Sequence, residues 1–190
     1  MAVCVLLLSG CGMFSARRDT PRPPGGASTA PSAPATPSTK GGGYYLDDGP
    51  GANAPANLDS IPDAVPRTEP LHRGALRPYT VMGRNYTPMT AVAPYRARGV
   101  ASWYGRRYHG KPTSSGEIYD MYAMTAAHTT LPIPSYVRVT HVASGKSVVV
   151  RVNDRGPFIK GRILDLSLGA ASVIDLQKSG VAKISYVVVK

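Results

Sequence analysis

The sequence predicts a mainly β protein: a small closed barrel of about six strands with one or two short helices, preceded by a disordered N-terminal tail. Three observations support this fold class. Short runs of β-branched and aromatic residues, separated by Gly and Pro turns, fill about the last 90 residues. One segment among them has helical character. The prolines gather upstream, where ten of the 18 lie between Pro21 and Pro66.

The expected strands alternate in side-chain type, as the strands of a half-buried sheet do. Within residues 135–141, Val137 and Val139 fall on one phase, and Tyr136 and Arg138 fall on the other. A hairpin turn at 143–146 leads to the return strand. The other expected elements are strands at 100–104, 147–152, 162–166 and 180–189, and a helix at 168–176 with Ser167 as its N-cap.

Composition divides the chain before the barrel, which we place at residues 98–190. Residues 11–70 are rich in Pro, Gly, Ser, Thr and Ala and cannot bury much apolar surface, so we expect a disordered linker there. Residues 71–97 contain extended pieces between prolines and glycines. We expect them to pack along the barrel as an arm, with Tyr79, Val81 and Tyr86 as contacts.

The first residues resemble a bacterial lipoprotein signal. An apolar run precedes Leu-Ser-Gly-Cys11, which is similar to the lipobox where a diacylglyceryl group is attached to the cysteine and the chain is cut just before it. The basic residues that usually precede such a run are missing. The resemblance implies a signal peptide at 1–10 and a membrane anchor through the lipid on Cys11. A generic cleaved signal and a buried structural segment are the alternatives.

The residue after the acceptor cysteine bears on the location. Gly12 is not the aspartate that retains enterobacterial lipoproteins at the inner membrane, so the resemblance implies the periplasmic face of the outer membrane of a Gram-negative bacterium. Both cysteines, Cys4 and Cys11, lie in this leader, so we expect no disulfide and no cysteine metal site in the barrel. No run of about 18 apolar residues predicts a transmembrane helix. We expect neither a metal nor a cofactor.

The positive charge is concentrated in the barrel. From Arg98 onward there are 13 Lys and Arg against 5 Asp and Glu, a net +8; before Arg98 there are 9 against 6, a net +3. The partner is then a polyanion: nucleic acid, anionic lipid or a cell-wall polymer with free carboxylates. General solubility is the alternative. An exported chain argues against nucleic acid.

Three polar residues in loop-like segments are candidates for chemistry: Glu117, His128 and Asp154. Two carboxylates are the minimum for acid and base work at a glycosidic bond. Each residue also has a structural explanation. Glu117 could be a solvated turn residue, His128 could cap a turn, and Asp154 could form an Asx-turn.

The motifs that carry these residues resemble, in order, those of the rare lipoprotein A family over about residues 66–190. The resemblance implies a double-psi β-barrel, the fold of expansins and some endoglucanases. It also implies the family's activity, lytic transglycosylation of glycan strands without stem peptides, which leaves 1,6-anhydro ends. The family's functional Glu, His and Asp fall on Glu117, His128 and Asp154. The motifs are Gly-Val-Ala-Ser-Trp-Tyr-Gly, Ser-Gly-Glu-x-Tyr-Asp-Met, Thr-Ala-Ala-His-x-Thr-Leu-Pro, Val-Val-Arg-Val-Asn-Asp-Arg-Gly-Pro-Phe and Arg-Ile-Leu-Asp-Leu-Ser.

The resemblance gives these residues roles. Asp154 is the expected general acid and base, because one carboxyl group with a raised pKa can carry out both proton transfers. Glu117 is expected to stabilise positive charge on the sugar or to keep Asp154 protonated by repulsion. His128 is expected to orient a carboxylate or a sugar hydroxyl. The expected substrate-binding residues are Trp103, Tyr104, Arg155 and Asp165, of which Trp103 could equally belong to the core and Asp165 could be structural.

Three functions follow from the sequence. The first is an endolytic peptidoglycan transglycosylase that cleaves MurNAc–GlcNAc bonds in cell-wall remodelling or cell separation. The second is a non-catalytic, expansin-like module that binds and loosens the wall. The third is a lipoprotein scaffold that binds division or envelope proteins. The sporulation-related repeat that many family members carry at the C-terminus is not found here, so we expect the barrel to bind glycan by itself or with a partner. We expect a monomer.

Overall fold

The computed structural model describes residues 48–49, 51 and 54–190. The chain divides into two units, Met1–Ser38 and Thr39–Lys190. The first unit lies outside the described residues, and with it the expected signal peptide and the lipid-bearing Cys11. No helix among the described residues is long and apolar enough to cross a membrane.

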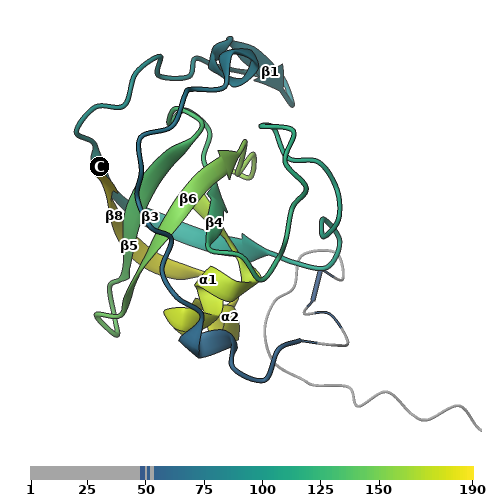
Figure 1. The fold of residues 1–190 in the computed structure, drawn as a ribbon, viewed down its shortest axis with the longest axis vertical. Helices are drawn as coiled ribbons and strands as arrows, with labels where there is room; N and C mark the ends of the chain where they lie inside the picture. The colour runs from purple at the N-terminus through teal and green to yellow at the C-terminus, as the bar shows by residue number, and fades with distance from the viewer. Residues whose placement is uncertain (1–47, 50, 52–53) are drawn as a thin grey trace, which may run out of the picture. The chain divides into compact units, whose positions relative to one another are not determined.

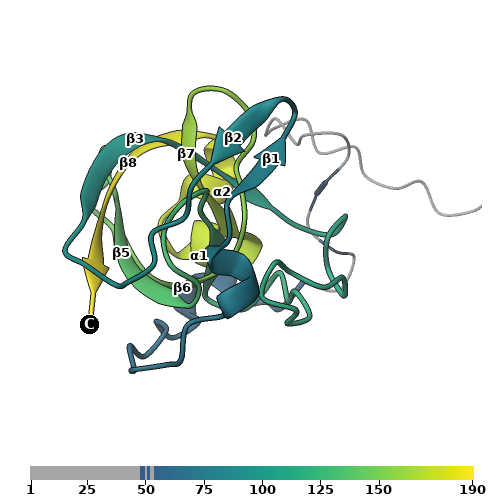
Figure 2. The same ribbon diagram turned by 90° about the horizontal axis from the view of Figure 1, so that it is seen from above.

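Six strands of the second unit close into a barrel, which confirms the predicted fold class (Figure 1). Their order around the barrel is β3-β7-β4-β6-β5-β8. Figure 2, which looks down on the molecule from above, shows the strands curving round this ring. The strands are β3 (Arg96–Tyr104), β4 (Thr125–Ala127), β5 (Ser135–His141), β6 (Ser147–Asp154), β7 (Arg162–Ser167) and β8 (Ala182–Val189).

The pairing explains one strand that the sequence did not predict. β4 is only three residues long and reads as part of a loop, yet it pairs in parallel with β6 and antiparallel with β7. The parallel pair β3–β7 and the antiparallel pairs β5–β6, β5–β8 and β3–β8 complete the closure. β4 therefore connects β6 to β7 and closes the barrel between them.

The barrel interior is filled by aliphatic side chains. Val137 and Val139 of β5 are fully buried, as the alternation in this strand predicts, and Leu164, Leu166 and Ile184 are fully buried beside them. Each such side chain contributes roughly 1.5–3 kcal/mol when it leaves water. These buried aliphatic side chains therefore pack the strands against one another in the barrel interior.

The predicted helix at 168–176 is broken in two. Ser167 caps its start as expected, because its Oγ accepts a hydrogen bond from the backbone N–H of Ala170 at 3.2 Å. α1 (Leu168–Val173) then ends, Asp175 adopts a left-handed conformation with φ 60°, and α2 (Leu176–Ser179) follows. Figure 1 shows both helices at the bottom of the barrel.

An arm precedes the barrel. β1 (Tyr79–Val81) and β2 (Arg84–Tyr86) form a hairpin whose two turn residues, Met82 and Gly83, both have positive φ, as a tight type I′ turn requires. The Tyr79 hydroxyl donates to the backbone oxygen of Thr129 at 2.7 Å. The hairpin therefore lies against the loop after β4, at the end of the barrel opposite the helices (Figure 1).

The packed chain begins earlier than the expected boundary at residue 70. Two short 3-10 helices, η2 (Leu58–Ser60) and η3 (Arg73–Leu76), lie before the first strand. Leu58, Ile61 and Ala64, all ahead of residue 70, pack against the core. The backbone N–H of Ala64 donates to Val149 O at 3.0 Å. Scattered apolar residues among prolines are therefore enough to hold this part of the chain on the barrel.

Candidate active site

Asp154 stands at the end of β6, where the ladder is irregular. β6 has one residue more than β4 at this point, because Val152 pairs with Ala126 while Asp154 pairs with Ala127. A bulge of this kind bends a strand and changes the direction of a side chain. The carboxyl group of Asp154 is therefore presented at the rim of the barrel.

Three donors hold one oxygen of this carboxyl group. Asp154 Oδ1 accepts hydrogen bonds from the backbone N–H of Ser114 at 2.8 Å, from the Ser114 hydroxyl at 2.6 Å and from the backbone N–H of Arg155 at 2.8 Å. The bond from Arg155 comes from the adjacent residue, so it is not the Asx-turn that the sequence allowed for, which needs the N–H two residues on. Oδ2 receives no hydrogen bond from the described residues, so it is the oxygen left for a ligand.

Asp154 lines a cavity of about 280 Å³ whose walls include four aromatic side chains. A second cavity of about 400 Å³ adjoins it, because Arg155 and Phe158 line both. The second cavity runs along the arm, past Tyr79 and Val81. We call these two adjoining cavities together the groove. The aromatic residues around the first cavity are Trp103, Tyr104, Tyr108 and Phe158.

Asp165 lines the same cavity as Asp154. Its side chain is buried, its Oδ2 accepts a hydrogen bond from the Arg162 guanidinium at 2.9 Å, and its Oδ1 has no hydrogen-bond partner. Burial raises the pKa of Asp165 to about 6, although the charge of Arg162 acts in the opposite direction. The backbone of Ser102, on the neighbouring strand β3, acts in the same direction as Arg162, so Asp165 has structural contacts as well as a place on the cavity wall.

Trp103 and Tyr104 are both core residues and cavity walls. They are 9% and 8% exposed and belong to the main hydrophobic cluster, and the small exposed part of each faces the cavity. Burial, with the nearby charges of Asp154 and Asp165, raises the pKa of the Tyr104 hydroxyl. Tyr108, 42% exposed, offers more surface for a sugar ring than Trp103 does.

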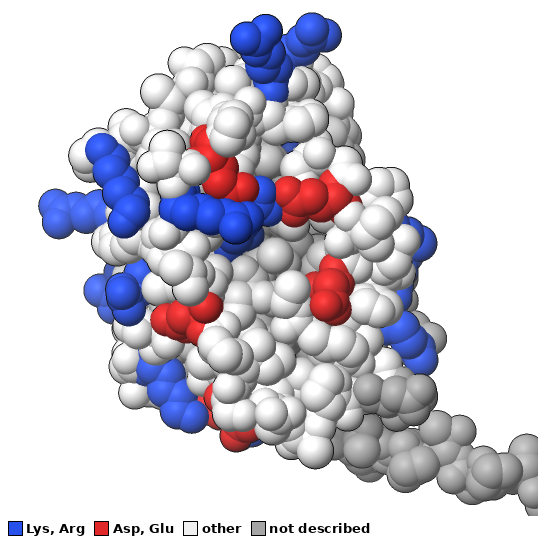
Figure 3. Space-filling view, in the orientation of Figure 1, with Lys and Arg blue, Asp and Glu red and all other residues white. Residues whose placement is uncertain are grey.

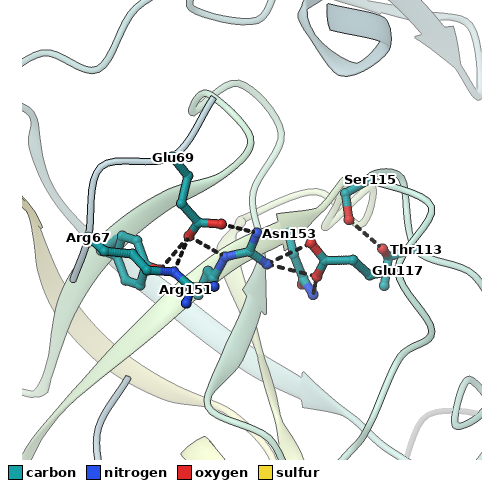
Figure 4. Close-up of polar contacts among 8 residues, drawn as sticks. Arg67, Glu69, Thr113, Ser115, Glu117, Arg151 and Asn153 are labelled. Carbon is teal, nitrogen blue, oxygen red and sulfur yellow. Dashed lines mark hydrogen bonds and ion pairs between the residues drawn. The ribbon is translucent and has the colours of Figure 1, made fainter. Parts of the chain in front are cut away.

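Glu117 lies outside this cavity, in a different cluster (Figure 4). Its two oxygens accept bonds from Arg151 Nη1 at 2.8 and 2.7 Å, and Oε2 also accepts from the Asn153 amide at 3.0 Å. Burial raises the pKa of Glu117, but the bonds from Asn153 and Arg151 outweigh it and the pKa is lowered. Glu117 is thus a neutralised carboxylate, which does not fit repulsion as a means of keeping Asp154 protonated.

The same arginine holds a second carboxylate. Glu69 accepts Arg151 Nε at 2.8 Å and Nη2 at 2.9 Å, and these bonds lower the pKa of Glu69 to about 2. Arg67 and the Tyr136 hydroxyl also contact Glu69. Figure 3 shows the result at the surface, where acidic side chains lie on both sides of a basic one on the face seen in Figure 1. Sequence reasoning missed this network, because Glu69 is far from Arg151 in the chain.

The Glu117 loop and the Asp154 strand are nevertheless connected. Thr113 N–H donates to Glu117 O at 2.8 Å, and Ser115 N–H donates to Asn153 O at 3.3 Å. The turn between them carries Ser114, which holds Asp154. Through its bonds to Arg151 and Asn153, Glu117 therefore holds its loop against β6, and this loop carries the Ser114 that positions Asp154.

The structure does not bring the ring of His128 to either carboxylate. The ring is buried, and its Nδ1 accepts the backbone N–H groups of Thr130 at 3.0 Å and Leu131 at 2.8 Å. Nε2 then carries the proton and bonds the Tyr186 hydroxyl at 2.7 Å. Burial, with the charge of Arg155, lowers the pKa of His128 to about 4, so the ring is neutral. Only its backbone N–H reaches Asp154, bonding the backbone oxygen at 3.0 Å.

Arg155 lines the groove, but its guanidinium is bonded to the protein itself. Nη1 donates to the backbone oxygens of His128 at 2.9 Å and Leu131 at 2.7 Å, and Nη2 donates to that of Ala75 at 2.7 Å. It therefore joins the arm, the loop after β4 and the end of β6. These bonds use three of the five guanidinium N–H groups, and the buried Nε has no hydrogen-bond partner among the described residues, so the expected contact between Arg155 and substrate stays a prediction.

Two cavity residues escaped sequence reasoning. Ser114 sits in a Ser-rich turn with no distinguishing signal. Asp48, from the segment expected to be linker, accepts the backbone N–H of Gly105 at 3.0 Å and of Arg107 at 2.7 Å, and it lines the cavity. Its signal was weak, an acidic pair beside two tyrosines. Among the described residues no group of three or more His, Cys, Asp and Glu could hold a metal.

The closed six-stranded barrel belongs to the class of double-psi β-barrels, and the comparisons agree. Residues 96–186 match the family model described as lytic transglycolase. Curated relatives named "Endolytic peptidoglycan transglycosylase RlpA" are 52% identical over 130 residues in Pseudomonas aeruginosa, 49% over 147 in Vibrio cholerae and 57% over 122 in Neisseria meningitidis. The barrel of this chain therefore belongs to the rare lipoprotein A family.

The match covers part of each protein. It takes in 67%, 77% and 64% of this chain, and 37%, 56% and 51% of the three relatives. Among solved structures, a papain inhibitor of Streptomyces is 21% identical, with a TM-score of 0.42, over 50% of this chain and 96% of its own. An expansin of Clavibacter michiganensis is 23% identical, with a TM-score of 0.38, over 50% and 51%.

Proposed function

We propose that this protein is an endolytic peptidoglycan lytic transglycosylase. It cleaves the MurNAc–GlcNAc bond in glycan strands that lack stem peptides and leaves 1,6-anhydroMurNAc ends, in cell-wall remodelling or cell separation. The observation that carries this proposal is the position of Asp154, whose carboxyl group is fixed by Ser114 and Arg155 in an aromatic-lined groove. The names and identities of the relatives support it.

The groove suits a chain of sugars. Sugar rings present flat apolar faces that pack against aromatic side chains, and Tyr108 and Phe158 line the groove beside the carboxylate. Denuded strands carry the free lactyl carboxylate of each MurNAc residue. The +8 charge of residues 98–190, from 13 basic and 5 acidic side chains, favours such a polyanion.

The reaction needs two proton transfers and no water. The 6-hydroxyl of MurNAc loses a proton as it attacks the anomeric carbon, and the departing GlcNAc oxygen gains one. Asp154 is suited to the first transfer, since three donors fix Oδ1 and leave Oδ2 to accept the proton. Glu117 is a positioning residue in this scheme, and His128 supports the backbone that carries Asp154.

The place of action is part of the proposal. Attachment of lipid to Cys11 would anchor the chain at the periplasmic face of the outer membrane, within reach of the wall. The sequence pattern around Cys11 supports this, and mass spectrometry of the protein purified from membranes tests it. A mass without a diacylglyceryl group would remove the anchor from the proposal.

Digestion of purified denuded sacculi tests the activity. We expect wild-type protein to release products with anhydro ends, detected by mass spectrometry, and Asp154→Asn to release at least about 100-fold less. Asp63→Asn is the matched control, because Asp63 is an exposed carboxylate that does not line the groove. Binding of sacculi by both wild type and Asp154→Asn, with no product from either, would replace catalysis with an expansin-like role in wall binding.

A further inference from the structure

Two carboxyl groups face one another across a single small residue. Asp154 of β6 and Asp165 of β7 both pair with Ala127 of β4, and all three residues line the same cavity. Neighbouring strands lie about 4.8 Å apart, so the two aspartate Cα atoms are roughly 10 Å apart. Pairs of carboxyl groups that flank a glycosidic bond are separated by about 5–9.5 Å. Ala127, which lines the cavity between the two aspartates, has a small side chain and leaves room there for the sugar.

The two groups have opposite surroundings. Asp154 accepts three hydrogen bonds on one oxygen, whereas Asp165 has one ion pair and one oxygen without a partner. The terminal torsion of an aspartate is broad, so a small rotation of the Asp165 carboxyl group can turn its unpartnered oxygen toward a ligand in the cavity. A sugar oxygen there would be the first hydrogen-bond partner of that oxygen.

We propose that Asp165 is a second catalytic residue, the general acid that protonates the departing glycosidic oxygen, and that Asp154 is the base. This inference rests on the proposed transglycosylase activity. In the step, the 6-oxygen bonds to the anomeric carbon as the glycosidic C–O bond breaks. The proton of the 6-hydroxyl passes to Asp154, and the proton of Asp165 passes to the leaving oxygen. Exchange with water afterwards returns both carboxyl groups to their starting states.

The charges around Asp165 fit this role. Burial raises its pKa to about 6, so the group keeps a proton in weakly acidic surroundings. Arg162 is the one cation bonded to it, and it opposes the rise. The activity should therefore fall as the pH rises above about 6, when Asp165 loses its proton. The titratable groups on the cavity wall besides Asp165 are Asp48, Tyr104, Tyr108, Asp154, Arg155 and Arg162.

A substrate whose leaving group needs no protonation distinguishes a general acid role of Asp165 from a structural role. We would compare the full chain and its variants on denuded glycan strands and on a short glycan whose reducing MurNAc carries 2,4-dinitrophenol, which departs without protonation. We expect Asp165→Asn to cleave strands about 100-fold more slowly or worse, but to release dinitrophenolate within about tenfold of wild type. Asp154→Asn should lose both activities.

The pH profile gives a second readout. Wild type on strands should lose activity above about pH 6, while its release of dinitrophenolate should not. The inference is overturned if Asp165→Asn cleaves strands at the wild-type rate. It is also overturned if a folded Asp165→Asn loses both substrates equally. A wild type that makes no anhydro product is a different result, since it contradicts the proposed function itself.

Ala127 provides a test that leaves every functional group in place. Ala127→Val adds two methyl groups between the two carboxyl groups, and we expect it to lose cleavage of both substrates while the urea midpoint stays close to that of wild type. Ala127→Gly, which leaves the space open, should keep both activities. Full activity in a folded Ala127→Val would show that the space between the aspartates is not where the bond is cleaved, and would overturn the inference.

Discussion

Two buried groups, His128 and Asp165, change the stability of the protein in opposite directions between pH 7 and pH 4.5. The pKa of His128 falls to about 4 from an ordinary 6.5, so the folded state resists its protonation and loses stability as the pH falls below 6.5. The pKa of Asp165 rises to about 6 from an ordinary 3.8, so the folded state binds its proton first and gains stability below pH 6.

The magnitudes follow from these intervals. Between pH 6.5 and pH 4.5, about two pH units, His128 is protonated in the unfolded chain but neutral in the folded protein, and this difference lowers the free energy of unfolding by about 3 kcal/mol. Between pH 6 and pH 4.5, about one and a half units, Asp165 is protonated in the folded protein but ionised in the unfolded chain, and this difference raises the free energy of unfolding by about 2 kcal/mol. Wild type should therefore lose only about 1 kcal/mol from this pair. Asp165→Asn removes the compensation, so it should lose about 3 kcal/mol over the same range. His128→Asn, whose amide oxygen can replace Nδ1 as acceptor, should instead gain about 2 kcal/mol on acidification.

Urea unfolding followed by tryptophan fluorescence at half-unit steps of pH measures these slopes. The comparison is within each variant, between pH 7 and pH 4.5, so the cost of the substitution itself cancels. Equal slopes in wild type, Asp165→Asn and His128→Asn would refute the reasoning, because they would mean that neither buried group changes its protonation on folding.

Three further substitutions have outcomes that urea unfolding or rates can check. Arg155→Met leaves three backbone carbonyls without their donor and should cost about 4 kcal/mol, against less than about 1 for Arg138→Met on the exposed face of β5. Similar losses in the two would contradict that account. Ser114→Ala removes the hydroxyl bonded to the cavity carboxylate and should lower kcat about tenfold in the sacculus digestion; an unchanged kcat would mean that the backbone bond suffices. Gly169→Ala should destabilise by about 2 kcal/mol or more, because the new Cβ would lie 2.4 Å from the backbone oxygen of Tyr122; an ordinary helix glycine would gain about 1, and a raised melting temperature would disprove the close contact.

The barrel was predictable because most of its strands show their pattern locally. β5 alternates, β6 follows a tight turn, and Ser167 is a recognisable cap. β4 was not predictable, because three residues give no periodicity and their pairing depends on strands distant in sequence. The broken helix escaped for a similar reason, since only the left-handed backbone at Asp175 divides α1 from α2.

The site was predictable in composition but not in arrangement. Sequence motifs indicated Asp154, Glu117 and His128 as one group, and the structure separates them into a cavity, a surface network and the core. Strand register decides this, and register is not visible in a single sequence. Burial likewise distinguishes Asp165 from the other carboxylates, and it is a property of the folded barrel alone.

The position of Arg151 has a practical consequence for the choice of a shorter fragment of the protein. One guanidinium is shared between Glu69, which precedes the barrel, and Glu117, whose loop presents Ser114 to the cavity. A fragment that starts at residue 96, where the family match begins, would leave that guanidinium half compensated and the loop more loosely fastened. The smallest piece worth expressing therefore includes Asp48 of the cavity wall and begins ahead of every strand.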